Sequence, residues 1–90
     1  MAASFYYIYI PPRTGVAASE VEKTMNLAID WFRFDDLNWI VYTTSDAKKW
    51  YSRLQKFVDP GGHVLVVKLD TSDYWGFMSK QLWEWLKKVR

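Results

Sequence analysis

The stretch FYYIYIPPR, residues 5–13, carries apolar and aromatic side chains at successive positions and then two prolines. Side chains alternate between the two faces of a strand, so such a strand presents apolar groups on both sides and needs cover on both. Pro11 and Pro12 have no backbone N–H and therefore stop strand pairing. The stretch predicts a strand over residues 5–10, covered on both faces.

The composition predicts one small domain over residues 1–90. The chain has 90 residues, half of them hydrophobic, and holds six Trp, six Tyr and five Phe, which is more aromatic surface than a small core needs. Cysteine is absent, which excludes disulfides and thiolate metal sites. We find no secretory leader pattern and no apolar run of membrane-spanning length, so we expect a cytoplasmic protein that does not enter a membrane.

Alternating helix and strand signals follow the first strand. Ser19 and Glu22 have the spacing of a capping box, and DWFRFDDLNWIVYTT predicts a hairpin with strands over residues 30–34 and 39–44. Ser45 is the expected cap of a second helix, whose apolar stripe includes Tyr51. HVLVVKLD, residues 63–70, reads as the fourth strand, and residues 71–90 read as a final helix.

The predicted element order is therefore β-α-β-β-α-β-α. With right-handed crossovers, this order predicts an α+β fold of the ferredoxin-like βαββαβ sandwich type with an added C-terminal helix.

Alternation along the strands assigns the two faces of the predicted sheet. An even-length turn that pairs Phe34 with Trp39 puts Arg33 on the face away from the first two helices, and Lys68 marks the less buried side of the fourth strand. The face away from those helices is then expected to show Phe5, Tyr7, Tyr9, Ile40, Tyr42, Val64 and Val66, edged by Arg33 and Lys68.

An apolar face of this size needs a cover in a water-soluble protein. Three covers suit it: the C-terminal helix of the same chain, a second copy of the protein, or the bases of a nucleic acid. Tyr fits all three, because its ring packs while its hydroxyl seeks a polar partner.

Charge is distributed unevenly along the chain. Residues 1–45 hold three bases and five acids, whereas residues 46–90 hold nine bases and five acids, a net +4. A basic second half is compatible with solvated helix faces and also with phosphate binding.

Residues that could carry catalysis are few. His63 is the single histidine, and we find no nucleophile, zinc or phosphate-loop motif, so we expect no cofactor. Magnesium-dependent phosphodiesterases need clustered carboxylates. The Asp35 and Asp36 pair fits a turn, and Asp70 and Asp73 fit a helix cap, with magnesium binding as the alternative role for these carboxylates.

The stretches DWFRFDDLNWIV, DPGGHVLVVKLD and YWGFMSKQLWEWL resemble small bacterial and phage proteins labelled the SinR family. More distantly, they are similar to the ferredoxin-like nuclease of CRISPR adaptation and to VapD-type toxins. The resemblance implies a homodimer and a metal-binding aspartate at the end of the first strand. Pro11 and Pro12 occupy that place here, so the resemblance implies the fold and the pairing but not the nuclease chemistry.

We therefore expect a non-enzymatic binding or assembly module, a homodimer or the partner of another protein. It would act through an aromatic sheet face with Tyr7, Tyr9 and Tyr42 and through the C-terminal helix with Trp83. The alternatives are an inhibitor of the phage type that docks on a host complex, and a nucleic-acid-binding protein. In the latter, the tyrosines would stack on bases. The basic side chains expected to lie near phosphates are Arg33, Lys68, Lys87, Lys88 and Arg90.

Overall fold

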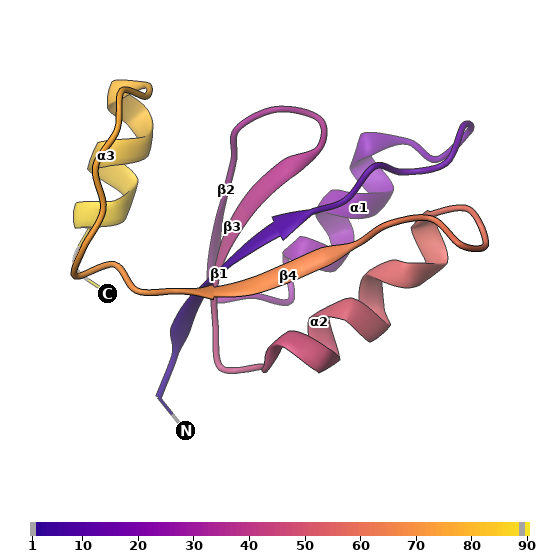
Figure 1. Cartoon of the computed structure of the whole chain (residues 1–90), viewed down its shortest axis with the longest axis horizontal. Coiled ribbons are helices and arrows are strands. Elements are labelled where there is room, and N and C mark those ends of the chain that lie inside the picture. Colours follow the sequence, from indigo (N-terminus) through magenta and orange to yellow (C-terminus); the bar gives the residue numbers. More distant parts are fainter. Residues whose placement is uncertain (1, 89) are drawn as a thin grey trace.

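The chain folds into a four-stranded antiparallel sheet with two helices against one face and a third helix on the other, in a computed structural model that describes residues 2–88 and 90 (Figure 1). The elements in chain order are β1 (Ser4–Tyr9), α1 (Ala18–Met25), β2 (Asp30–Arg33), β3 (Asn38–Thr43), α2 (Ala47–Leu54), the short 3-10 helix η1 (Gln55–Phe57), β4 (Leu65–Leu69) and α3 (Lys80–Lys87). The predicted order of elements and the α+β class are confirmed.

The strands lie in the order β2-β3-β1-β4, so β1 is an inner strand. β1 and β2 are both antiparallel to β3 and therefore run in the same direction, with β3 between them. In the same way β3 and β4 run in one direction on either side of β1. Helix α1 joins β1 to β2, and α2 joins β3 to β4. Both helices cover one face of the sheet (Figure 1).

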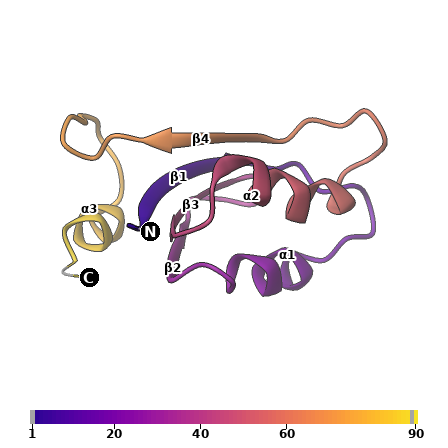
Figure 2. The ribbon, with the colours of Figure 1, turned by 90° about the horizontal axis from the view of Figure 1, so that it is seen from below.

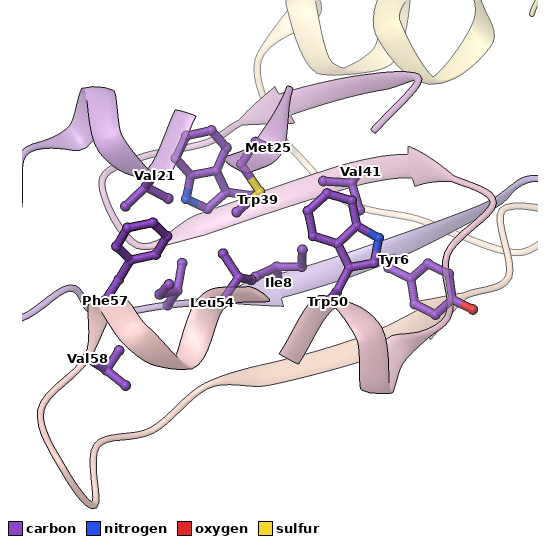
Figure 3. Close-up of a cluster of buried hydrophobic side chains, with 11 residues drawn as sticks. Tyr6, Ile8, Val21, Met25, Trp39, Val41, Trp50, Leu54, Phe57 and Val58 are labelled. Carbon is purple, nitrogen blue, oxygen red and sulfur yellow. The ribbon is translucent and has the colours of Figure 1, made fainter. Parts of the chain in front are cut away.

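The core lies between this face and the two helices. Ile8 and Ile10 have no exposed surface and point to the helices, as the alternation along the first strand predicts. Trp39 from β3 and Trp50 from α2 are the largest fully buried side chains, and Figure 3 shows both among smaller apolar groups. The Trp50 indole N–H donates to Thr43 Oγ1 at 3.1 Å, so this buried polar group is satisfied.

The helix starts differ from the predicted ones. Ala17, not Ser19, is the N-cap of α1. Asp46, not Ser45, caps α2 by accepting from the Lys49 amide. Tyr51 is exposed, because it lies at the margin of the stripe that α2 turns toward the sheet.

The final helix is much shorter than predicted. It begins at Lys80, where the Ser79 side chain accepts from the Leu82 amide, and residues 70–79 form a linker with no regular structure. The helix ends at Lys87, so Lys88 and Arg90 lie beyond it.

The face assignment was wrong for β2 and β4. Arg33, not Phe34, is opposite Trp39, and a one-residue change of register moves every side chain of a strand to the other face. Arg33 therefore lies on the helix face. Lys68 lies there too, since it is opposite Tyr6, a core residue; β4 is an edge strand, where a long side chain reaches water past the helix.

Candidate interaction surface

The sheet face away from α1 and α2, here called the aromatic face, is built from all four strands. The cross-strand partners Phe5 and Tyr42 lie on it with ring centroids 4.8 Å apart, as do the partners Tyr7 and Ile40. On β4, Val67 pairs with Tyr7 and so shares this face. Its members are Phe5, Tyr7, Tyr9, Asp30, Phe32, Asn38, Ile40, Tyr42, Leu65, Val67 and Leu69.

Helix α3 covers one end of the aromatic face. The Trp85 ring lies 5.7 Å from the ring of Phe5 and 5.9 Å from that of Phe32, both measured between centroids. Leu82, on the same side of the helix, is buried. Of the three covers considered from the sequence, the chain's own last helix is therefore present, over part of the face.

Arg90 stabilises the packing of α3 against the sheet. Its guanidinium stacks over the rings of Trp85, Phe5 and Tyr42, with 4.4, 5.1 and 5.2 Å from the central carbon to the ring centroids. It also donates to the Trp85 carbonyl at 2.8 Å and approaches Asp30 Oδ2 at 3.4 Å. Only 9% of the side chain is exposed, so these cation–π contacts are largely shielded from water.

Asp30 is the acidic residue in the contact between the C-terminal segment and the sheet. Burial would raise the pKa of Asp30, but the Trp85 indole, the Trp31 amide and the Lys88 ammonium together outweigh it, and the pKa lies below its ordinary value. The indole nitrogen of Trp85 is buried and makes no hydrogen bond of ordinary geometry, so its effect on the carboxylate is that of a nearby dipole. The Lys88 ammonium is 3.3 Å from Asp30 Oδ2.

The other end of the aromatic face is open, and we call Tyr7, Tyr9, Leu65 and Val67 the open patch. Leu65 is 52% exposed and Val67 41% exposed. The Tyr7 hydroxyl donates to Asn38 Oδ1, and desolvation, with a smaller contribution from Asp35, raises the pKa of Tyr7. Tyr7 is thus half-buried, and its hydroxyl is held at the edge of the open patch by Asn38.

The linker between β4 and α3 exposes two large apolar side chains, Trp75 and Phe77, completely. Beside them Tyr74 stacks on Trp83, with ring centroids 5.7 Å apart and planes inclined by 17°. A hollow of about 380 Å³ lies between the linker and α3, lined by Tyr74, Trp75, Gly76, Trp83 and Lys87. A second groove connects Tyr74 and Trp75 with Leu69, at the end of β4, so the linker is continuous with the aromatic face.

Most of the basic residues expected near phosphates form internal ion pairs. Arg33 binds Glu22 at 3.3 Å and Asp36 at 2.6 Å, on the helix face. Lys88 and Arg90 both approach Asp30. Lys68 and Lys87 are exposed.

The acidic residues considered for metal binding serve local structure. The hydrogen bond from the Leu37 amide and further bonds from Asn38 lower the pKa of Asp35, which closes the β2–β3 turn. The Ser72 hydroxyl and amide bind Asp70 and lower its pKa. Within residues 2–88 and 90, no group of three His, Cys, Asp or Glu side chains is placed to hold a metal ion.

Sequence reasoning missed Trp75, Phe77, Trp85 and Asp30. The first two belong to a segment read as helix, although Gly76 between them weakens a helix and signals a loop. Trp85 and Asp30 are brought together by the docking of α3, which no local pattern encodes.

Comparison of the chain with protein-family models, with curated proteins and with solved structures finds no match. No helix in the described part of the chain is long and apolar enough to cross a membrane. The resemblance to the SinR family stays a prediction.

Proposed function

We propose that this protein is a non-enzymatic assembly module that forms a homodimer through the open patch and the linker. The observation that supports it is the complete exposure of Trp75 and Phe77 in a linker that is continuous with an apolar sheet face. A large aromatic side chain covers roughly 150–250 Å² when buried, so these two alone present roughly 400 Å². Together with Leu65 and Val67, this exposed apolar surface is at least as large as the largest patch of a typical monomer, about 300–600 Å², and such patches are often functional.

We further propose that the fold is of the ferredoxin-like type with an added helix. Read from its other edge, the strand order is β4-β1-β3-β2, and two βαβ units each enclose a third strand. This arrangement supports the split βαβ type. α3 is then an addition that covers part of the face left free by the two helices.

A non-enzymatic role is supported by the structural roles of the residues considered for metal binding and catalysis. Pro11 and Pro12 follow β1, where the nuclease relatives implied by the resemblance place a metal-binding aspartate. The carboxylates of Asp35 and Asp70 are engaged in turns, and His63 is exposed at a loop.

Light scattering coupled to size exclusion tests the proposal. We expect the wild-type mass to be twice the 10.7 kDa of one chain at micromolar concentration. The double variant Trp75→Ser with Phe77→Ser is expected to elute as a monomer, because both side chains lose their apolar contact. Tyr51→Ser, a change of an exposed ring on α2, is the matched control and should leave the dimer intact. A monomeric wild type, or a double variant that still dimerises, contradicts the proposal.

Binding of single-stranded nucleic acid is the second candidate, and the stacked pair of Tyr74 and Trp83 beside Lys87 favours it. Bases stack on such rings and a lysine can contact the neighbouring phosphate. Fluorescence anisotropy of a labelled oligonucleotide, at low and at high salt, measures this. Lys87→Ala should lower the affinity and its salt dependence, and no binding at low salt would remove this candidate.

A further inference from the structure

β4 forms one edge of the sheet. Among the described residues it pairs with β1 alone, and Figure 2 shows it along one margin of the molecule with no other segment beyond it. An edge strand exposes unpaired backbone N–H and C=O groups and can pair with another chain unless it is guarded.

The register fixes which backbone groups of β4 are free. The Ile10 amide donates to Leu37 on the β3 side, and bonding directions alternate along a strand, so the even-numbered residues of β1 bond to β3. Tyr7 and Tyr9 therefore bond to β4, through Val67 and Leu65. It follows that the N–H and C=O groups of Val66 and Lys68 point outward, away from β1.

The two edge strands differ in how well charged side chains protect them from pairing with another chain. The opposite edge, β2, carries Asp30 and Arg33, both in ion pairs. On β4, Leu65 and Val67 are exposed, and Lys68 is the single charged residue of the strand. β4 is thus the less protected edge.

The geometry points to a two-fold dimer in which β4 pairs with β4 of a second copy, antiparallel and centred on Val67. This inference rests on the self-association proposed above and gives it a specific interface. In this register Val66 of one copy lies directly opposite Lys68 of the other, and the two residues exchange both backbone hydrogen bonds. The two-fold axis repeats this pair on its other side. Leu65 is opposite Leu69 of the second copy, on the aromatic face, where apolar cross-strand pairs are favourable.

Charge separates this register from the neighbouring one centred on Lys68. A two-fold axis at Lys68 would place two like charges directly opposite each other, which is unfavourable. With the axis at Val67, Lys68 faces Val66 instead. The two sheets then join into one of eight strands, with both aromatic faces on the same side.

The same register accounts for the exposed linker. Asp70, where the linker begins, lies opposite Val64 of the second copy. The linker is thereby brought to the Leu65 end of the other subunit's open patch. Trp75 and Phe77 of one copy and the open patch of the other become neighbours, although each is exposed in the single chain.

Disulfide trapping tests the register, and the absence of cysteine makes the test clean. In Val67→Cys the two thiols face each other across the axis in a non-hydrogen-bonded pair, where Cα atoms lie about 4.5 Å apart, a separation that a disulfide spans. We expect most of this variant to become a covalent dimer under mild oxidation, as seen by non-reducing electrophoresis.

Leu65→Cys is the matched control. Its two thiols would be four residues apart along the strand, roughly 13 Å, which is too far for a disulfide. A mixture of Leu65→Cys and Leu69→Cys chains should instead cross-link as a heterodimer, and it tests the register without any change at Val67.

The outcomes separate this inference from the proposed function. A wild type that dimerises while neither Val67→Cys nor the mixture cross-links would overturn the edge pairing and leave self-association standing. Strong cross-linking of Leu65→Cys alone would overturn the register. A wild type that stays monomeric overturns both.

Discussion

Replacing Arg90 by alanine should release α3 from the sheet without unfolding the core. The lost stacking on three rings in a nearly closed site is worth about 1–2 kcal/mol. The hydrogen bond to the Trp85 carbonyl adds about 1 kcal/mol, and the 3.4 Å ion pair with Asp30, whose carboxylate is partly open to water, adds about 0–1 kcal/mol. The docking of α3 should therefore weaken by about 2–4 kcal/mol, roughly 30- to 700-fold in its equilibrium constant.

Native-state amide hydrogen exchange measures this local opening directly. We expect the protection of the α3 amides to fall by that factor in Arg90→Ala, while Ile8 and Val41 in the core keep theirs. Lys87→Ala, at an exposed position in the last turn of the same helix, is the control and should change little. If the α3 amides of Arg90→Ala stay within threefold of their wild-type protection, the fastening role of Arg90 is refuted.

Three further changes follow from single contacts. The pKa of Asp30 is lower in the folded chain than its ordinary value near 3.8, so its contribution to stability is complete above about pH 4 and is lost as the pH falls through the folded pKa. Urea midpoints should fall more between pH 6 and 2 for the wild type than for Asp30→Asn, in which Asp35 and Asp70 still have lowered pKa values; equal falls would contradict the role of Asp30. Thr43→Val leaves the buried Trp50 N–H without its acceptor and should lower the free energy of unfolding by about 1–3 kcal/mol, measured by urea titration. In Gly62→Ala the added Cβ would lie 2.8 Å from the Asp59 carbonyl oxygen, so a loss of about 1–3 kcal/mol is expected, and an unchanged thermal midpoint would show that the loop gives way freely.

The sequence contained enough to predict the order of the elements and the two faces of β1. Ile8 and Ile10 alternate with tyrosines, and two prolines mark the end of the strand, so local chemistry alone decides that element. The faces of β2 and β4 depended on longer-range facts. The hairpin is shifted by one residue because Asn38 begins β3 and its carbonyl accepts from the Phe34 amide, which leaves three turn residues, 35–37, rather than four. Lys68 reaches water from the helix face because β4 is at an edge.

The interaction surface was predicted in outline. Tyr7, Tyr9 and Tyr42 lie on the face where alternation put them. Its division into a covered and an open part was out of reach, because it depends on where α3 docks. The ion pairs of Arg33 with Glu22 and of Arg90 with Asp30 join residues 11 and 60 positions apart, and spacing along the chain does not indicate them.

The inner position of β1 has a consequence for synthesis on the ribosome. This strand is made first, yet its two neighbours, β3 and β4, begin 34 and 61 residues after its own start. Sheets assembled from such distant segments close late and slowly. On the ribosome, β1 therefore stays without its β4 partner until residues 65–69 have been made, and its tyrosine-rich face is open during that time to chaperones that bind apolar peptides.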